Sequence, residues 1–455
     1  MRRRAQASDS ARIPAPPVPG VDPRLSLHDA PEAPVTQSTS TVLEDVQQPV
    51  SRAWIWLMVL AQFGVFVAFI TPLAISLAIR LAEIAPGREE YLGYITGAGA
   101  AWVMLTAPLL GILSDRTRTR IGRRRPFMIG GMVVGMISLF VMATAPTPLL
   151  LGVGWVLAQF GWGQVLSALQ IRTADRLPEQ QRGRVAGLTG FSTQIAPVLG
   201  VSIAGVFAGE PLLLFFIPGI VGAALTLLFV IFMREPDSRR IKLPPLRLGA
   251  TLRKFVFNPR QYPDFAWVWL GRFFFYFGLS LNTTFTAFFF AQRLGVTVEA
   301  VAAIIATLSL GSILATSLGA IGGGFLSDKL KRRRIFVFCA SLFFAGGAVI
   351  MALSSGLPLL VTGSLISALG IGMFSAIDQA LLLDVLPERS TDAGRFMGIT
   401  GFATSVPQAV APLLAPLFLV IGAAGDEKNY SLLYILAGVC TVLGGLCALR
   451  VRSVR

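Results

Sequence analysis

The chain has 455 residues, of which 54% are hydrophobic and only 14% are charged, and its mean hydropathy is +0.69. This composition places it among integral membrane proteins rather than soluble domains. The three cysteines lie in apolar runs without paired spacing, and the single histidine, His28, lies in a proline-rich segment. We therefore expect no disulfide, no metal site, no cofactor and no enzymatic activity.

The net charge of +15 comes from basic residues that gather on alternate connections between apolar runs. Of the 39 lysines and arginines, 34 lie at the termini or on these connections. Such asymmetry follows the positive-inside rule, so it predicts a multi-pass protein of the plasma (inner) membrane with both termini in the cytoplasm. A nucleic-acid partner is not expected.

Residues 1–50 are rich in Pro, Ala, Ser and Gln, and we expect a disordered cytoplasmic tail. About twelve apolar runs of spanning length follow. They start near Trp54, Tyr91, Pro126, Leu149, Val185, Pro211, Asp264, Glu299, Ile335, Leu357, Phe396 and Ser431. The prediction is therefore an all-α protein with six spans in 51–233, a basic cytoplasmic linker in 234–263, and six spans in 264–455.

An internal repeat supports this division. The second run ends in Gly-Ile-Leu-Ser-Asp-Arg at 111–116, followed by further arginines up to position 125, and a related Gly-Phe-Leu-Ser-Asp-Lys stands at 324–329. The offset is 213. A second stretch, 170–191, returns in part at 379–402. Two related halves of six spans each explain both repeats.

These features resemble the major facilitator superfamily over residues 52–455. The loop at 114–127 resembles that of sucrose/proton carriers and of glycoside–pentoside–hexuronide symporters, although the histidine of the sucrose carriers is missing. The resemblance implies a monomeric secondary transporter that works by alternating access, with a small-molecule substrate and a proton or cation gradient. A symporter for a sugar or glycoside is the first interpretation.

Two alternatives stay open. A proton-coupled exporter of amphipathic drugs is one, although Leu157 and Phe160 occupy places where such antiporters carry Arg and Gln. A non-transporting, transporter-like membrane sensor is the other.

The repeated signature also predicts a cytoplasmic gate. A carboxylate at the end of a helix faces the negative pole of that helix and needs a partner. The family pattern implies that Asp115 lies near Arg395 at the start of span 11, and Asp328 near Arg184 at the start of span 5. The expected gate residues are Gly111, Asp115, Arg116, Arg123, Arg124, Asp175, Glu179, Arg184, Asp328, Asp384, Glu388 and Arg395.

We expect the proton-coupling site at positions where one half carries a charged residue and the other half an apolar one. Arg272 and Asp378 each lie roughly 12 Å into their spans, whereas their counterparts Val59 and Leu169 are apolar. A charge inside a span is costly unless it is paired, so we predict proton coupling by this pair. A purely structural bridge is the alternative.

Neutral hydrogen-bonding side chains inside the spans suit a polyol such as a sugar, although each alone could equally hold two helices together. Helical periodicity places Gln159, Trp162 and Gln170 on one face of the fourth span, and Arg272, Tyr276 and Thr283 on one face of the seventh. The predicted substrate-binding residues are Gln62, Gln159, Trp162, Gln170, Gln194, Tyr276, Asn282, Thr283 and Gln408.

Overall fold

The computed structural model describes residues 49–233, 235, 237–239, 257–388, 393–422 and 428–453, and every regular element in these ranges is helical. The predicted tail and most of the predicted linker lie outside the described residues, so their character stays a prediction. The first half contains α2 (Arg52–Thr71), η1 (Pro72–Ser76), α3 (Leu77–Ile84), α4 (Glu90–Arg116), α5 (Arg125–Thr144), α6 (Pro148–Arg176), α7 (Glu179–Val206) and α8 (Pro211–Phe232). The second half contains α10 (Pro263–Thr284), α11 (Thr286–Leu294), α12 (Val298–Leu330), α13 (Arg333–Ala352), α14 (Leu357–Val385), α15 (Ala393–Val420) and α16 (Tyr430–Leu449).

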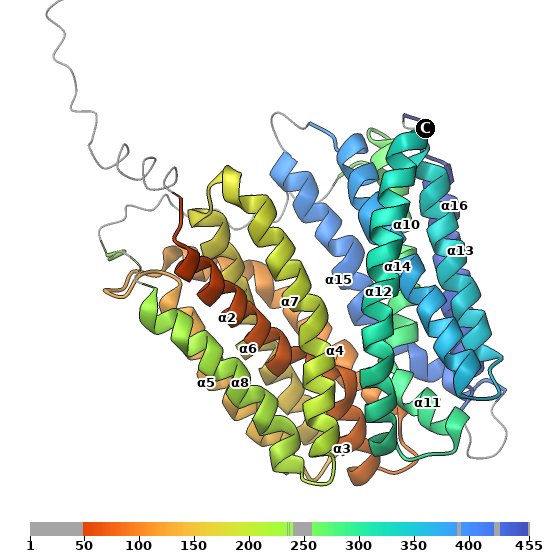
Figure 1. The fold of residues 1–455 in the computed structure, drawn as a ribbon, viewed down its shortest axis with the longest axis horizontal. Coiled ribbons are helices and arrows are strands. Elements are labelled where there is room, and N and C mark those ends of the chain that lie inside the picture. The colour runs from red at the N-terminus through yellow and green to blue at the C-terminus, as the bar shows by residue number, and fades with distance from the viewer. Residues whose placement is uncertain are drawn as a thin grey trace, which may run out of the picture. The chain divides into compact units, whose positions relative to one another are not determined.

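Figure 1 shows long helices in both halves of the chain, as the predicted all-α membrane fold requires. Ten helical segments of the described residues are long and apolar enough to cross a membrane, and the bent pair α10 and α11 adds an eleventh. α4, with 27 residues, is the twelfth. Its length of roughly 40 Å exceeds the roughly 30 Å of a hydrocarbon core.

The first and seventh spans are interrupted at equivalent positions. The first changes from α-helix to a π-turn at Pro72, whose ring nitrogen cannot donate a backbone hydrogen bond. The seventh bends by 50° between α10 and α11, at Phe285. Position 72 maps onto 285 at the offset of 213, so both halves share this irregularity.

The two ends of the helices differ in charge. We call the end at which α4 and α12 finish, beside the arginine-rich loops, the basic end. We call the opposite end, at which α3 and α11 finish, the far end. Close contacts between the halves lie towards the far end: a Cβ on Gly93 of α4 would stand 2.3 Å from the carbonyl oxygen of Pro412 on α15, and one on Gly205 of α7 would stand 3.2 Å from Cβ of Ala302 on α12.

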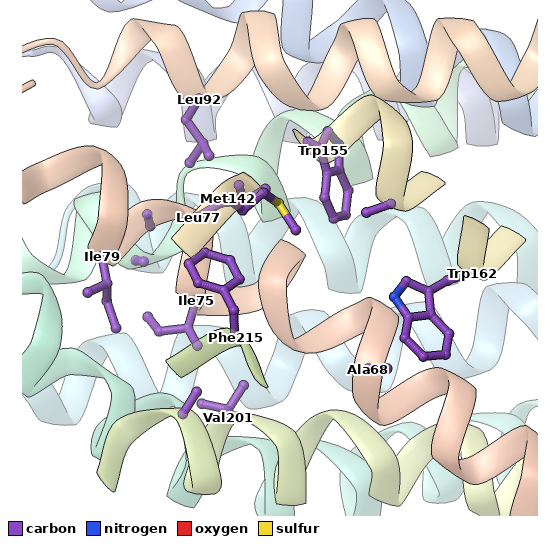
Figure 2. Close-up of a cluster of buried hydrophobic side chains, with 14 of the residues drawn as sticks. Ala68, Ile75, Leu77, Ile79, Leu92, Met142, Trp155, Trp162, Val201 and Phe215 are labelled. Carbon is purple, nitrogen blue, oxygen red and sulfur yellow. The ribbon is translucent and has the colours of Figure 1, made fainter. Parts of the chain in front are cut away.

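Small residues allow helices within a half to approach closely, as expected in membranes where apolar burial alone does not drive helices together. α12 and α14 are the clearest case. A Cβ on Gly319 would lie 2.1 Å from the carbonyl oxygen of Leu369, and one on Gly372 would lie 1.9 Å from that of Thr316. In the first half, the large buried side chains in Figure 2, such as Trp155 and Phe215, fill the space between helices.

We expect Gly319→Ala to lower the stability of the folded protein, because its Cβ meets backbone rather than a movable side chain. The cost should be about 1–3 kcal/mol, the range for overpacked interiors. Thermal unfolding of the purified protein measures it. Gly322→Ala is the matched control, because a Cβ at this position of the same helix has no neighbour within 4 Å. Equal melting temperatures for the two variants would contradict this account of α12–α14 packing.

Candidate functional site

A buried ion pair joins the seventh and tenth spans. The Arg272 guanidinium on α10 lies 3.4 Å from the Asp378 carboxylate on α14, and the two side chains are 14% and 4% exposed. The structure thus brings together the two charged residues that the sequence singled out. At their counterparts in the first half it places buried Val59 and Leu169, so this pair has no equivalent there.

Aromatic rings surround the pair. Arg272 lies 5.7 Å from the centre of the Tyr276 ring, one turn along α10. Phe374, one turn before Asp378, meets Tyr276 edge-on and stacks on Phe275 with ring centres 3.5 Å apart. In such surroundings a charge is costly unless it is paired, so the two charges depend on each other. Arg272 Nε is buried and has no hydrogen-bond partner among the described residues, so the guanidinium keeps an unused donor.

The predicted substrate-binding residues fall into three groups. Gln170, Gln194, Thr283 and Gln408 are exposed, and Gln62, Gln159 and Tyr276 are half-buried. Asn282, near the bend between α10 and α11, is buried, and its amide nitrogen has no partner among the described residues. These eight side chains remain candidates.

Trp162, the ninth predicted residue, stays a proposed contact. Its side chain is fully buried in the first half (Figure 2), and its indole nitrogen has no hydrogen-bond partner among the described residues. The indole packs against Gly135 of α5, where an added Cβ would stand 2.7 Å from the ring. It therefore belongs to the packed interior of the first half, because the missing side chain at Gly135 opens a slot on α5. Sequence reasoning placed it on the same helical face as Gln159, and periodicity alone does not show which neighbour that face meets.

Sequence reasoning missed Trp155, one turn before Gln159 on α6. Its ring stacks on Phe69 of α2 at 5.7 Å and 7°, and its buried indole nitrogen has no hydrogen-bond partner among the described residues. A Cβ on Gly99 of α4 would stand 2.5 Å from that nitrogen and 3.1 Å from Cγ of Gln159. The i, i+4 spacing from Gln159 was the available signal.

The basic end carries two equivalent charge clusters. In the first half the Arg124 guanidinium donates to Ser114 Oγ at 2.6 Å and lies 4.0 Å from the Asp175 carboxylate. In the second half Arg333 bridges Asp328, at 3.0 Å, and Asp384, at 2.5 Å. Arg124 maps onto Arg333, and Asp175 onto Asp384, at the offset of 209, so each half repeats the same arginine–aspartate contact.

The predicted contact of Asp328 with the start of span 5 is not the one formed in this structure. Asp328 is 66% exposed and pairs with Arg333 of its own half. An added Cβ on Gly111 or on Gly183 would have no neighbour within 4 Å, so these parts of α4 and α7 have open space beside them. Among the other predicted gate residues, Glu388 accepts a hydrogen bond from the Tyr262 hydroxyl at 2.5 Å.

The remaining gate residues occupy the same end of the helices. Arg395 covers the ring of Phe396 at 5.3 Å, Arg184 is exposed, and Arg116 and Arg123 are half-buried. The side chains of Asp115 and Glu179 lie outside the described part of the structure, so their contacts stay predictions.

Glu235, just after α8, is a further residue that sequence reasoning missed. Its carboxylate accepts hydrogen bonds from the backbone amides of Arg124 and Arg125 at 3.0 and 3.2 Å. These amides open α5, so the negative charge caps the positive pole of that helix and fixes the preceding arginine-rich loop.

Two related halves of long apolar helices, with a buried ion pair in the second half, define a multi-pass membrane protein. The family model of the Major Facilitator Superfamily matches residues 55–323 and 268–455. The chain therefore belongs to this superfamily, whose members are transporters and not enzymes.

Curated relatives are similar over parts of their lengths. A stretch of 76 residues, 17% of this chain and 12% of the relative, is 43% identical to the general alpha-glucoside permease of Schizosaccharomyces pombe. Another of 84 residues, 18% of this chain and 17% of the relative, is 32% identical to the arabinose-proton symporter of Bacillus subtilis. The chain spans about half, 55%, of the uncharacterized MFS-type transporter YfhI of Bacillus subtilis; that match, over 52% of this chain, is 24% identical.

Solved structures share the fold at low identity. The nucleoside transporter NupG superimposes with a TM-score of 0.71 at 11% identity, over 88% of this chain and 98% of that one. A D-xylose-proton symporter does so with a TM-score of 0.66 at 16% identity, also over 88% and 98%. At such identities the likeness shows the fold alone.

Proposed function

We propose that the protein moves a sugar or glycoside together with a proton or another cation by alternating access. The observation that carries this proposal is the Arg272–Asp378 pair, because a buried charge pair in one half only is explained more simply by coupling than by scaffolding. Similarity to an alpha-glucoside permease and to an arabinose-proton symporter supports the substrate class. So do the neutral amide and hydroxyl groups of the candidate binding residues.

Alternating access requires an interface that closes at one end while it opens at the other. Contacts between α4 and α15 hold the halves together towards the far end, whereas Asp328 at the basic end pairs within its own half. In the opposite state we propose that Asp115 and Asp328 reach the starts of α15 and α7. The positive poles at the starts of α15 and α7, together with Arg395 and Arg184, would then bind the two carboxylates and hold the basic end closed.

Asp378 is the proposed proton carrier. The ionised carboxylate attracts Arg272, and protonation removes the Coulomb part of that attraction. A change in protonation therefore changes how firmly α10 is held to α14. Since α10 continues through the bend into α11 at the far end, this contact is placed to link proton binding to the movement of the halves.

Transport assays test the proposal directly. The purified protein is reconstituted in vesicles, and uptake of labelled sucrose, maltose, arabinose and myo-inositol is measured with and without an imposed pH gradient. We expect accumulation of at least one sugar only when the gradient is present, or when a sodium gradient replaces it. Efflux of a cationic dye without any sugar uptake would instead favour the drug exporter.

We further propose that the basic end faces the cytoplasm. Single cysteines at positions 20 and 245, in a version that lacks the native cysteines, should not react with an impermeant thiol reagent in intact cells. Both should react after the cells are broken, which shows that the thiols are present and reactive. Labelling of either position in intact cells would reverse the orientation.

A further inference from the structure

An ion pair joins the two halves at the far end. Glu90, the first residue of α4, lies 3.1 Å from the ammonium of Lys428, which precedes α16 by two residues. The two side chains are 19% and 20% exposed, so most of this contact is covered by protein. The other far-end contacts between the halves described above, such as Gly93 with Pro412, involve small or apolar groups.

The partial positive charges at the starts of α4 and α16 favour this pairing of Glu90 with Lys428. Glu90 stands in the first turn of α4, where a negative charge is favourable. Lys428 stands just before α16, where the positive pole disfavours an ammonium, and Glu90 offsets that cost. The position of Lys428 is fixed further by its carbonyl oxygen, which accepts a hydrogen bond from the Gln292 amide at 3.1 Å.

The surroundings allow the pair to separate. A cavity of about 410 Å³ lies beside it, and both halves line it. Its lining is largely apolar but includes Glu89 of the first half and Gln292, Lys428 and Tyr430 of the second. Water that enters the cavity can solvate the charges as they part. Glu90 also lies 3.6 Å from Arg88, which is 63% exposed and belongs to its own half. The carboxylate therefore keeps a partner after Lys428 leaves.

We propose that Glu90 and Lys428 form the latch of the far end, and that their separation is the step that opens the far side. In the opened state Glu90 keeps Arg88, and Lys428 is solvated. This inference rests on the alternating-access part of the proposed function and is independent of the substrate.

The test measures how often the far end opens. Ala409 of α15 is 2% exposed, and its carbonyl oxygen lies against Gly97 of α4. Ala409→Cys, in a version whose native cysteines are replaced by alanine, therefore reports opening by its rate of reaction with a thiol reagent in the purified protein. We expect Lys428→Gln and Glu90→Gln each to raise this rate roughly tenfold, the effect of losing about 1.4 kcal/mol of charge attraction. The double variant, Glu90→Gln with Lys428→Gln, should react no more than about threefold faster than either single variant, because each single change already breaks the pair.

Glu83→Gln is the matched control. It breaks the ion pair between Arg80 and Glu83, whose charged groups are 2.5 Å apart. This pair also lies at the far end, but both of its residues belong to the first half. The Glu83→Gln variant should leave the labelling rate unchanged. Labelling rates for Lys428→Gln and Glu90→Gln that match the rate for Glu83→Gln would overturn the latch. A double variant whose increase is the product of the two single increases would also overturn it, because the two residues would then act independently. A protein that transported no sugar would still give the expected rates, so the latch and the sugar proposal fail separately.

Discussion

Asp378→Asn is expected to abolish uphill accumulation of substrate while leaving exchange between equal concentrations within about threefold of the parent rate. Asparagine keeps the size of the side chain but neither ionises nor takes up a proton, so the carrier can still change conformation without moving a proton. The measurement is uptake into vesicles with an imposed pH gradient, compared with counterflow exchange without one. The loss of accumulation should be complete, because coupling requires a group that titrates.

The matched control for this variant is Asp384→Asn. Asp384 lies on the same helix, α14, but is paired with Arg333 at the basic end, and its side chain is 36% exposed. It should keep the dependence of accumulation on the pH gradient, whereas loss of its gate contact with Arg333 lowers only the rate of transport. If Asp378→Asn still concentrates substrate when the gradient is applied, Asp378 is not the coupling group, and the ion binds elsewhere.

Arg272→Ala is expected to stop both accumulation and exchange and to destabilise the protein. It leaves the Asp378 carboxylate, which is only 4% exposed, without its opposite charge. Breaking a buried pair from one side typically costs about 3–5 kcal/mol. Thermal unfolding of the purified protein and counterflow exchange measure the two effects. Arg272→Lys keeps the charge and should recover most of the stability, although it loses the planar contact with Tyr276.

The double variant, Arg272→Ala with Asp378→Ala, separates a structural bridge from a functional site. Removing both charges relieves the uncompensated carboxylate, so stability should return towards that of the parent. Transport coupled to the pH gradient should not return. A stable double variant that still accumulates substrate would make the pair a structural bridge.

The basic end shows how far a repeat extends structural prediction. The repeated Ser-Asp signature identified equivalent ends of α4 and α12, and the structure finds equivalent arginine–aspartate contacts there, Arg124 with Asp175 and Arg333 with Asp384. The predicted contact of Asp328 with the start of α7 is not formed in this structure, and it stays a proposal for the opposite state. Here Arg333, five residues further along the chain, takes the carboxylate instead.

Helical periodicity was informative about faces but not about neighbours. It placed Arg272 and Tyr276 on one face of α10, and the structure finds them in contact. The same reasoning put Trp162 on the face of Gln159, but it could not show that the Trp162 ring packs against Gly135 and is fully buried. A face can meet solvent, lipid or another helix, and small residues on a distant helix decide which.

Hydropathy and the internal repeat were enough to predict the membrane class, the two related halves, and the two charges, Arg272 and Asp378, that have no counterpart in the first half. These properties depend on hydropathy along a segment and on comparison of one half with the other, so no long-range contact is needed to see them. The structure was needed to show that Arg272 and Asp378 form an ion pair, that Trp162 is buried, and that Glu90 of one half meets Lys428 of the other. The physical reason is that helices approach only where glycines and other small residues permit, and those sites are far apart in the chain.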